Sequence, residues 1–284
     1  MGLGLWLDGV VKSLGAKVLG TEMLNDAYDV FDITFECDDQ PAMRLALAER
    51  LGHLPVDFCL QPREGRCKSL LVADMDSTII DVECLDELAD FAGKKAEISA
   101  ITERAMRGEL EFEGALRERV GMLKGLPISA LQRAYDERIQ LNPGARTLVR
   151  TMAANGARCL LVSGGFTFFT ERVAAAAGFQ DHRANTLIEA GGALTGEVGE
   201  PILGREAKLA ALSAEASALG LDLSATLAVG DGANDLAMIE AAGLGVAYRA
   251  KPLVAARAHA KVDHTDLTAL LYFQGYRPDE FVTD

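Results

Sequence analysis

No apolar run in this 284-residue sequence approaches the roughly 18 residues that a membrane-spanning helix needs. The first residues, MGLGLWLDG, also lack the basic segment of a secretion signal, and Asp8 interrupts their apolar stretch early. We therefore expect no membrane partner, no secretion signal and a cytoplasmic location.

Cysteine and basic residues are both scarce. The cysteines are odd in number and their spacing fits no zinc motif, which favours reduced thiols in a cytosolic protein; they are Cys37, Cys59, Cys67, Cys84 and Cys159. Lysine and arginine number 28 against 42 acidic residues, so the net charge is −14. Such a surface repels nucleic acid, anionic lipid and phosphorylated metabolites. A phosphate site in this chain must therefore create its own local positive field.

Three continuous apolar runs indicate strands that are covered on both faces: LLVA at 70–73, CLLVSGG at 159–165 and ATLAVGDGAND at 225–235. Helical patterns separate them, at 145–156, 168–178, 205–220 and 235–243, and shorter strands are expected around 244–248 and 261–265. Strands that alternate with helices predict an α/β fold with a doubly wound parallel sheet.

One stretch breaks this alternation. Residues 83–141 show no strand signal, and glycines or a proline divide them into four amphipathic helices. Because an insertion that leaves the carboxyl end of a strand lies over the crevice where such sheets bind ligands, we interpret it as a lid. Downstream, LIEAGGALTGEV predicts a hairpin that turns at Gly191–Gly192.

The first 68 residues form a separate small α+β pattern. We predict helices at 10–20 and 41–52 and strands at 28–37 and 56–61. The rest divides into a core of residues 69–82 and 142–276, the lid at 83–141 and a tail at 277–284.

Polar clusters follow each of the three apolar runs: Asp74, Asp76, Ser77 and Thr78; then Ser163, Gly164 and Gly165; then Asp231, Asn234 and Asp235. In a parallel sheet these ends lie on one edge. Carboxylates that meet there repel each other unless a cation neutralises them, and Mg²⁺ with oxygen ligands suits a phosphate substrate. Lys208, in the first turns of a predicted helix, would add a second positive charge.

Such a site supports phosphoryl transfer. An ionised aspartate attacks phosphorus and forms an aspartyl-phosphate, while the cation, lysine and backbone amides spread the charge of the equatorial oxygens. A second carboxyl group protonates the leaving alkoxide, although the pKa of a free aspartate is only ~3.9. Neighbouring carboxylates would raise that pKa, so the mechanism requires two aspartates with different tasks.

These residues resemble a known family. DMDST at 74–78, VSGG at 162–165, Lys208 and GDGAND at 230–235 look like the four motifs of the haloacid dehalogenase superfamily, in order. The lid narrows the resemblance to the phosphoserine phosphatase family, because DVECLDELADFAG, AMRGELEFEGALRERVGMLKGLP and NPGA resemble its segments. This implies a Rossmann-like core with a helical cap, a Mg²⁺-dependent phosphatase of serine biosynthesis and O-phosphoserine as the small-molecule substrate.

The resemblance also implies roles for the catalytic residues. Asp74 is the nucleophile and Asp76 the general acid and base. The metal is held by Asp74, Asp231 and the backbone carbonyl of Asp76, with Asp235 supporting the metal shell. Ser163, Gly164, Lys208 and Asn234 hold the phosphate.

The remaining implied roles concern the amino-acid part of the substrate. Glu83 would bind its ammonium group and Arg119 its carboxylate, while Met106 and Phe112 pack on it from the lid. On a helix Arg117 and Arg119 lie about 200° apart, so one of them faces the pocket, and the resemblance selects Arg119. Without the resemblance, Glu83 and Arg119 fit the solvent-facing charges that are usual on lid helices, and Met106 and Phe112 fit the core of the lid.

Two alternatives to hydrolysis remain open. A phosphotransferase of the same fold would pass the phosphoryl group to a small alcohol such as homoserine. A sensor would bind metal and phosphoserine without turnover, although a sensor has no need of a nucleophile such as Asp74. Residues 1–68 resemble a divergent ferredoxin-like or ACT-like module, which suggests a homodimer contact or amino-acid sensing.

Overall fold

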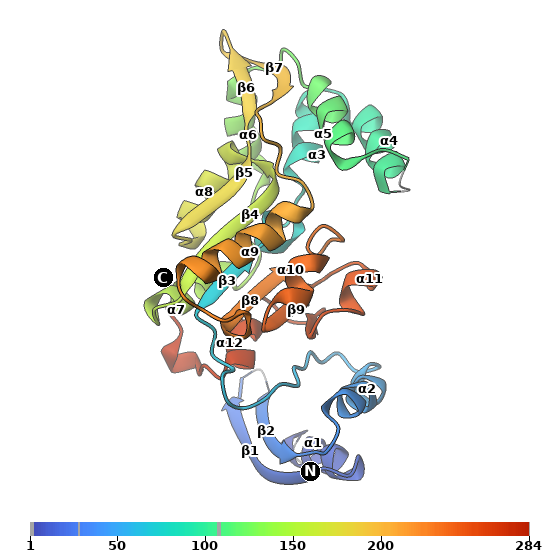
Figure 1. The fold of residues 1–284 in the computed structure, drawn as a ribbon, viewed down its shortest axis with the longest axis vertical. Coiled ribbons are helices and arrows are strands. Elements are labelled where there is room, and N and C mark those ends of the chain that lie inside the picture. The colour runs from blue at the N-terminus through green and yellow to red at the C-terminus, as the bar shows by residue number, and fades with distance from the viewer. Residues whose placement is uncertain (1–2, 28, 107–108, 284) are drawn as a thin grey trace.

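The computed structural model describes residues 3–27, 29–106 and 109–283, and a six-stranded parallel sheet forms its centre (Figure 1). The strands lie in the order β10–β9–β8–β3–β4–β5, and each neighbouring pair is parallel. Their bounds are β3 (Leu70–Ala73), β4 (Arg158–Phe166), β5 (Asp181–Asn185), β8 (Thr226–Gly230), β9 (Leu244–Tyr248) and β10 (Ala260–Val262). The predicted doubly wound core is confirmed, and the strands with polar ends, β3, β4 and β8, are adjacent.

Helices cover both faces of this sheet because the side chains of its strands alternate. In β3, Leu71 and Ala73 pack into one apolar cluster and Leu70 and Val72 into another, all fully buried. Burial of each leucine contributes about 1.5–3 kcal/mol. The first cluster includes α7 (Ala145–Ala154), α8 (Thr167–Ala177) and α12 (Ala269–Gln274); the second includes α9 (Glu206–Ala218), α10 (Leu236–Ala241) and α11 (Pro252–Ala255).

The edge strand β5 has no counterpart among the predicted strands. Its sequence, DHRAN, lacks the apolar run that indicates a central strand. It is nevertheless held by ion pairs, since Arg158 lies 3.2 Å from Asp181 and Arg183 lies 2.8 Å from Glu215. An edge strand is half exposed, so polar residues are compatible with it.

Four helices form the cap where the sequence predicts them: α3 (Cys84–Phe91), α4 (Lys95–Met106), α5 (Phe112–Gly121) and α6 (Ile128–Arg138). The predicted hairpin is also present as β6 (Leu187–Ala190) and β7 (Ala193–Val198). Its backbone bonds to the cap, with Gly125 N–H donating to Leu194 O at 2.8 Å and Ile128 N–H to Gly192 O at 3.0 Å. The hairpin therefore attaches the cap to the core at a place distant from the cap's own chain connections.

The N-terminal unit consists of α1 (Leu3–Ser13), β1 (Lys17–Asn25), β2 (Val30–Glu36) and α2 (Gln40–Leu51). The predicted helix over 10–20 is wrong in its second half, because Gly15 at φ 88° ends the turn and residues from Lys17 onward pair with β2. The predicted strand over 56–61 is also wrong. Val56, Phe58 and Leu60 do alternate inward onto the N-terminal apolar cluster, but none of the strands in the described part of the chain pairs with their backbone.

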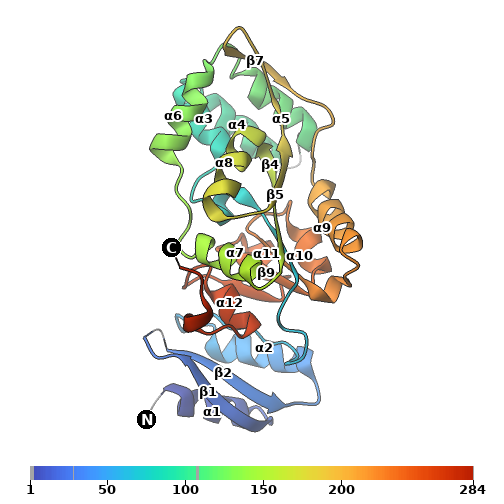
Figure 2. The same ribbon diagram turned by 90° about the vertical axis from the view of Figure 1, so that its left-hand side faces the viewer.

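The N-terminal unit and the cap lie at opposite ends of the molecule (Figure 2). Asp57 joins the unit to the core, because its carboxylate accepts hydrogen bonds from the backbone N–H groups of Asp263, His264 and Thr265 at 2.8–3.3 Å. Any influence of this unit on the cap therefore passes through the core. Among the described residues, no helix combines the length and apolar character needed to cross a membrane.

Candidate active site

The turn after β3 presents the first acidic residue of the site. Asp74 N–H donates to Val229 O at 3.0 Å, which extends the pairing of β3 with β8 by one residue. A tight turn, η1 (Met75–Ile79), follows and buries Met75 and Ile79. The apolar side chains of this turn thus anchor it in the core, and the Asp74 side chain is left at the sheet edge, only 5% exposed.

Three carboxylates and one ammonium group converge beside it. Oxygens of Asp74, Asp231 and Asp235 lie within 4.8 Å of one another. Lys208 Nζ lies 2.6 Å from Asp74 Oδ1 and 2.5 Å from Asp235 Oδ1. Gly230 makes this approach possible, because a Cβ at that position would lie 2.4 Å from Asp235 Cγ. The predicted polar ends of β3 and β8 are therefore brought together, with the predicted lysine between them.

The electrostatics of this cluster call for a further cation. Burial and the charge of Asp235 raise the pKa of Asp74 well above its usual value, against the opposing effect of Lys208. Burial and Asp235 also raise the pKa of Asp231 to about 6. Burial lowers the pKa of Lys208, but Asp235 and Asp74 together raise it more. Three acids facing one lysine leave surplus negative charge, and their oxygen donors fit a divalent cation such as Mg²⁺.

The second aspartate of DMDST is oriented by two hydrogen bonds. Cys84 N–H donates to Asp76 Oδ1 at 2.9 Å, and Ser163 Oγ–H donates to Asp76 Oδ2 at 3.0 Å. Burial raises the pKa of Asp76, although both hydrogen bonds act in the opposite direction. A carboxyl group with a raised pKa is suited to donate a proton and later to accept one.

Glu83 lies at the N-terminus of α3 and accepts a hydrogen bond of 2.8 Å from Ser77 Oγ. Glu83 is exposed to solvent, and the protein around it partly desolvates its carboxylate. This partial desolvation and the charge of Asp76 raise the pKa of Glu83 to about 7.

The two arginines of α5 have different environments. Arg119 is half-buried, donates from Nε to Ala115 O at 3.1 Å, and feels the charges of Asp86 and Glu83. Burial nevertheless lowers the pKa of Arg119. Arg117 is exposed and pairs with Glu200 on the core. Arg119 therefore lies near the acid predicted to bind the ammonium group, whereas Arg117 does not.

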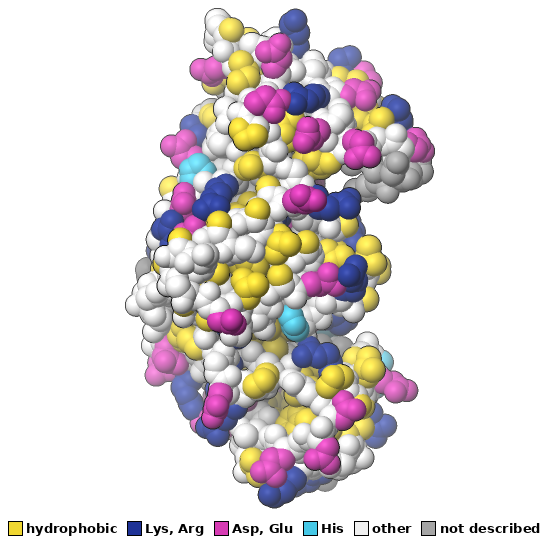
Figure 3. Space-filling view, viewed as in Figure 1, with side chains coloured by type: hydrophobic (Ala, Val, Ile, Leu, Met, Phe, Trp, Pro, Cys, Tyr) yellow, Lys and Arg dark blue, Asp and Glu magenta, His cyan; other side chains and the backbone are white. Residues whose placement is uncertain are grey.

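Phe112 closes the cap on the core. An ideal Cβ at Gly164 would lie 3.6 Å from Phe112 Cζ, and one at Gly204 would lie 3.7 Å from Phe112 Cδ1. Beside the Phe112 ring lies a groove of about 500 Å³ that is lined by residues 111–113 and 204–206. Figure 3 shows a notch between the cap and the core. The side chain of Met106, the other predicted lid contact, lies outside the described residues.

The phosphate-loop candidates lie at the carboxyl ends of β4 and β8, the two strands that flank β3. Ser163 and Gly164 are at the end of β4, and Asn234 lies in the turn between Asp231 and α10. Sequence reasoning missed Asn185, whose buried amide donates to Gly164 O at 2.9 Å and accepts from Leu203 N–H at 2.7 Å. It also missed the contact of Ser77 with Glu83 and that of Cys84 with Asp76, for which no local sequence signal exists.

Comparisons with known proteins found similar sequences. The family model of haloacid dehalogenase-like hydrolases matches residues 71–240. A phosphoserine phosphatase of a Polaromonas species is 46% identical over 207 residues, which cover 71% of this chain and 88% of that protein.

Two solved structures are similar as well. One, a haloacid dehalogenase family hydrolase of Salmonella enterica serovar Typhi, is 30% identical with a TM-score of 0.87, and the match covers 97% of this chain and 95% of that one. The other is a phosphoserine phosphatase with an analogue of the phospho-aspartyl intermediate. It is 38% identical with a TM-score of 0.67, and the match covers 73% of this chain and 99% of that one.

Proposed function

The chain belongs to the haloacid dehalogenase-like hydrolases and, within them, to the phosphoserine phosphatases, and we propose that it hydrolyses O-phosphoserine to serine and phosphate through an aspartyl-phosphate on Asp74. The observation that carries this proposal is the convergence of Asp74, Asp231, Asp235 and Lys208 at one sheet edge, with Asp76 adjacent.

The proposed reaction has two steps. A carboxylate oxygen of Asp74 bonds to phosphorus while the bond from phosphorus to the serine oxygen breaks, and Asp76 gives its proton to that oxygen. Asp76 then takes a proton from water as the water oxygen bonds to phosphorus and the bond to Asp74 breaks. Phosphate leaves, and both aspartates return to their starting forms.

Mg²⁺ is the metal that we propose, held by Asp74, Asp231 and the Asp76 carbonyl, with Asp235 supporting the shell. When bound, the ion would offset the negative charge of the phosphate and of the surrounding carboxylates. Lys208 supplies a fixed positive charge in the same place, and it is buried with its ammonium group held by two carboxylates.

The remaining candidates are the substrate contacts that we propose. Ser163, Gly164, Lys208 and Asn234 would bind the phosphate, Glu83 the ammonium group and Arg119 the carboxylate as a two-pronged donor. Phe112, which already packs on Gly164, would cover the substrate from the cap together with Met106.

A panel of small phosphomonoesters, assayed for phosphate release with and without Mg²⁺, tests the proposal. We expect strong preference for O-phosphoserine over phosphothreonine, glycerol phosphate and a nucleotide, and loss of activity on chelation of the metal. Equal rates across the panel would contradict the substrate, and full activity in chelator would contradict the metal. Adding homoserine and seeking a phosphorylated product distinguishes hydrolysis from phosphoryl transfer to an alcohol.

Replacing Arg119 by alanine should raise KM for O-phosphoserine about tenfold or more, because a charged hydrogen-bond partner of the substrate carboxylate is lost. Arg117→Ala is the matched control, since its exposed pair with Glu200 lies outside the cleft. Steady-state kinetics of both variants decides the question. A raised KM in Arg117→Ala alone would mean that the other face of α5 binds the substrate.

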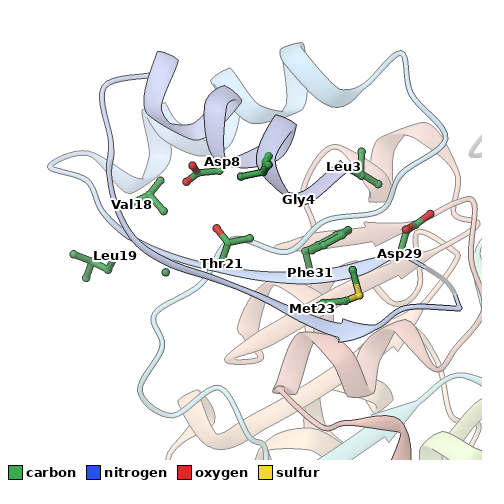
Figure 4. A pocket seen from close by; sticks show the side chains of 11 residues that line it. Leu3, Gly4, Asp8, Val18, Leu19, Thr21, Met23, Asp29 and Phe31 are labelled. Atoms are coloured by element: carbon green, nitrogen blue, oxygen red, sulfur yellow. The ribbon is translucent and has the colours of Figure 1, made fainter. Parts of the chain in front are cut away.

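We also propose that residues 1–68 form an ACT-like unit that pairs with a second copy of the chain. Among the described residues β1 pairs with β2 alone, and Leu19 and Met23 on β1 are about half exposed. An antiparallel β1–β1 contact centred on Thr21 would set Leu19 of each copy opposite Met23 of the other. The side chains of Leu19 and Met23 also line an apolar groove of about 620 Å³ between α1 and the β1–β2 pair (Figure 4).

Light scattering tests this pairing, because Leu19→Glu should convert a dimer to a monomer whereas Leu45→Glu, exposed on α2, should not. A monomeric parent chain would contradict it.

The remaining domain boundaries, 69–82 with 142–276, 83–141 and 277–284, are part of the same proposal. So is a cytoplasmic location, which the five free thiols support and cell fractionation tests.

A further inference from the structure

The segment from Asp76 to Cys84 folds back on itself and joins the nucleophile turn to the cap. Ser77 N–H donates to Val82 O at 3.3 Å, and Cys84 N–H donates to Asp76 Oδ1 at 2.9 Å. Between these two bonds, Ser77 Oγ donates to Glu83 Oε1 at 2.8 Å. The acid–base residue and the acid proposed to bind the ammonium group are therefore held by one small loop.

Ser77 adopts an uncommon backbone conformation to make this contact. Its φ of 56° and ψ of 6° lie in the left-handed region, which costs a residue with a Cβ free energy. The strain is located one residue from Asp76 and is compensated by hydrogen bonds within the loop. Strain that is retained beside a catalytic group is an observation that points to a functional role.

The carboxylate of Glu83 has no other protein hydrogen-bond partner in the part of the chain that the structure describes, although the backbone carbonyl of this residue accepts from the N–H groups of Asp86 and Glu87. Glu83 occupies the N-cap position of α3, yet its side chain makes no capping bond to that helix. A glutamate with three rotatable bonds in an open cleft samples several rotamers unless a neighbour selects one. The Ser77 hydroxyl binds one carboxylate oxygen and leaves the other oxygen available to a ligand.

We infer that Ser77 is a positioning residue for substrate specificity, and that its hydroxyl holds Glu83 where the substrate ammonium group binds. This inference rests on the proposed function, because it takes Glu83 as the ammonium acceptor. It predicts that Ser77 matters for phosphate esters that carry an amino group and has little effect on esters that do not.

Three substrates separate these cases. O-Phosphoserine carries both charged groups, O-phosphoethanolamine carries the ammonium group alone, and 3-phosphooxypropionate carries the carboxylate alone. We expect Ser77→Ala to lower kcat/KM about tenfold for the two amino substrates, through KM, and to change it less than twofold for 3-phosphooxypropionate. The expected loss is that of one hydrogen bond to a charged group.

Two further variants distinguish the hydroxyl from the backbone. Ser77→Gly also removes the hydroxyl but favours the left-handed conformation, so it should show the same selective loss as Ser77→Ala. Ser129→Ala, on the exposed surface of α6, should leave kcat/KM unchanged for all three substrates. A wild-type rate in Ser77→Gly, with a loss in Ser77→Ala, would assign the effect to backbone strain and overturn the inference.

The remaining outcomes separate this inference from the proposed function. A wild-type enzyme that hydrolyses 3-phosphooxypropionate as well as O-phosphoserine would contradict the proposed role of Glu83 itself. A wild-type enzyme that prefers amino substrates, with a Ser77→Ala variant that keeps the full preference, would contradict the inference alone. An equal loss on all three substrates would likewise overturn it, because it would show a general disturbance of the turn.

Discussion

Asp74→Asn is expected to lower phosphate release from O-phosphoserine by about 10⁴-fold or more, because an amide cannot form the phosphorylated intermediate. The wild-type enzyme, quenched in acid during turnover, should carry one phosphoryl group that mass spectrometry locates on Asp74. The variant should carry none. The trapped intermediate reports the covalent step directly, and assays at saturating substrate separate both readouts from how well the substrate binds.

The fold of this variant should survive. Lys208 keeps its contact of 2.5 Å with Asp235 when the Asp74 carboxylate is replaced by a neutral amide of the same shape. Thermal unfolding should therefore occur within a few degrees of the wild-type temperature. Asp279→Asn, in the exposed C-terminal segment, is the matched control and should have wild-type activity. Undiminished phosphate release by Asp74→Asn would end both the hydrolase and the phosphotransferase interpretations.

The second large effect is expected at Lys208. Lys208→Met should lower kcat/KM by about 10³-fold, because a preorganised positive charge is lost from the place where the phosphoryl oxygens develop charge. Steady-state kinetics at saturating Mg²⁺ measures this loss. Lys95→Met, exposed at the start of α4, is the control and should be near wild type. A loss of less than tenfold in Lys208→Met would mean that the lysine has a structural role alone.

The same substitution should make stability depend on pH in metal-free protein. Without Lys208, the buried carboxylates of Asp74 and Asp235 lack their counter-ion, which costs about 3–5 kcal/mol at neutral pH. Burial and the charge of Asp235 then hold the pKa of Asp74 in the folded state above the unfolded value, with no lysine to oppose them. The folded state therefore binds more protons, so the variant gains stability as the pH falls from 8 to 5. Urea unfolding at both pH values measures this gain. A free energy of unfolding that lies equally far below the wild-type value at both pH values would contradict it.

Much of the core could be read from the sequence because its signals are local. LLVA and the following DMDST predicted both a covered strand and the turn where its acids lie, and Lys208 followed a helix start. The same local reasoning failed at β1 and β5. There the strand forms because a partner backbone is available, since neither KVLGTEMLN nor DHRAN carries a strong apolar run.

The lid shows most clearly what could not be predicted from the sequence. Helical spacing limited the pocket-facing choice to one of Arg117 and Arg119, but it could not say which faces the cleft. In the structure the two side chains have different environments, because Arg119 is half-buried near Glu83 and Arg117 pairs with the core surface, and this difference supports the choice of Arg119.

The sequence by itself determined the catalytic chemistry of this protein: acids at strand ends, a lysine to oppose them and a helical insertion above. Each of these depends on residue type and spacing along the chain. Tertiary structure alone decided which groups steady one another, such as Ser77 with Glu83 and Asn185 with Gly164. Both hydrogen bonds depend on the three-dimensional path of the chain, including one left-handed residue, and neither composition nor periodicity encodes that path.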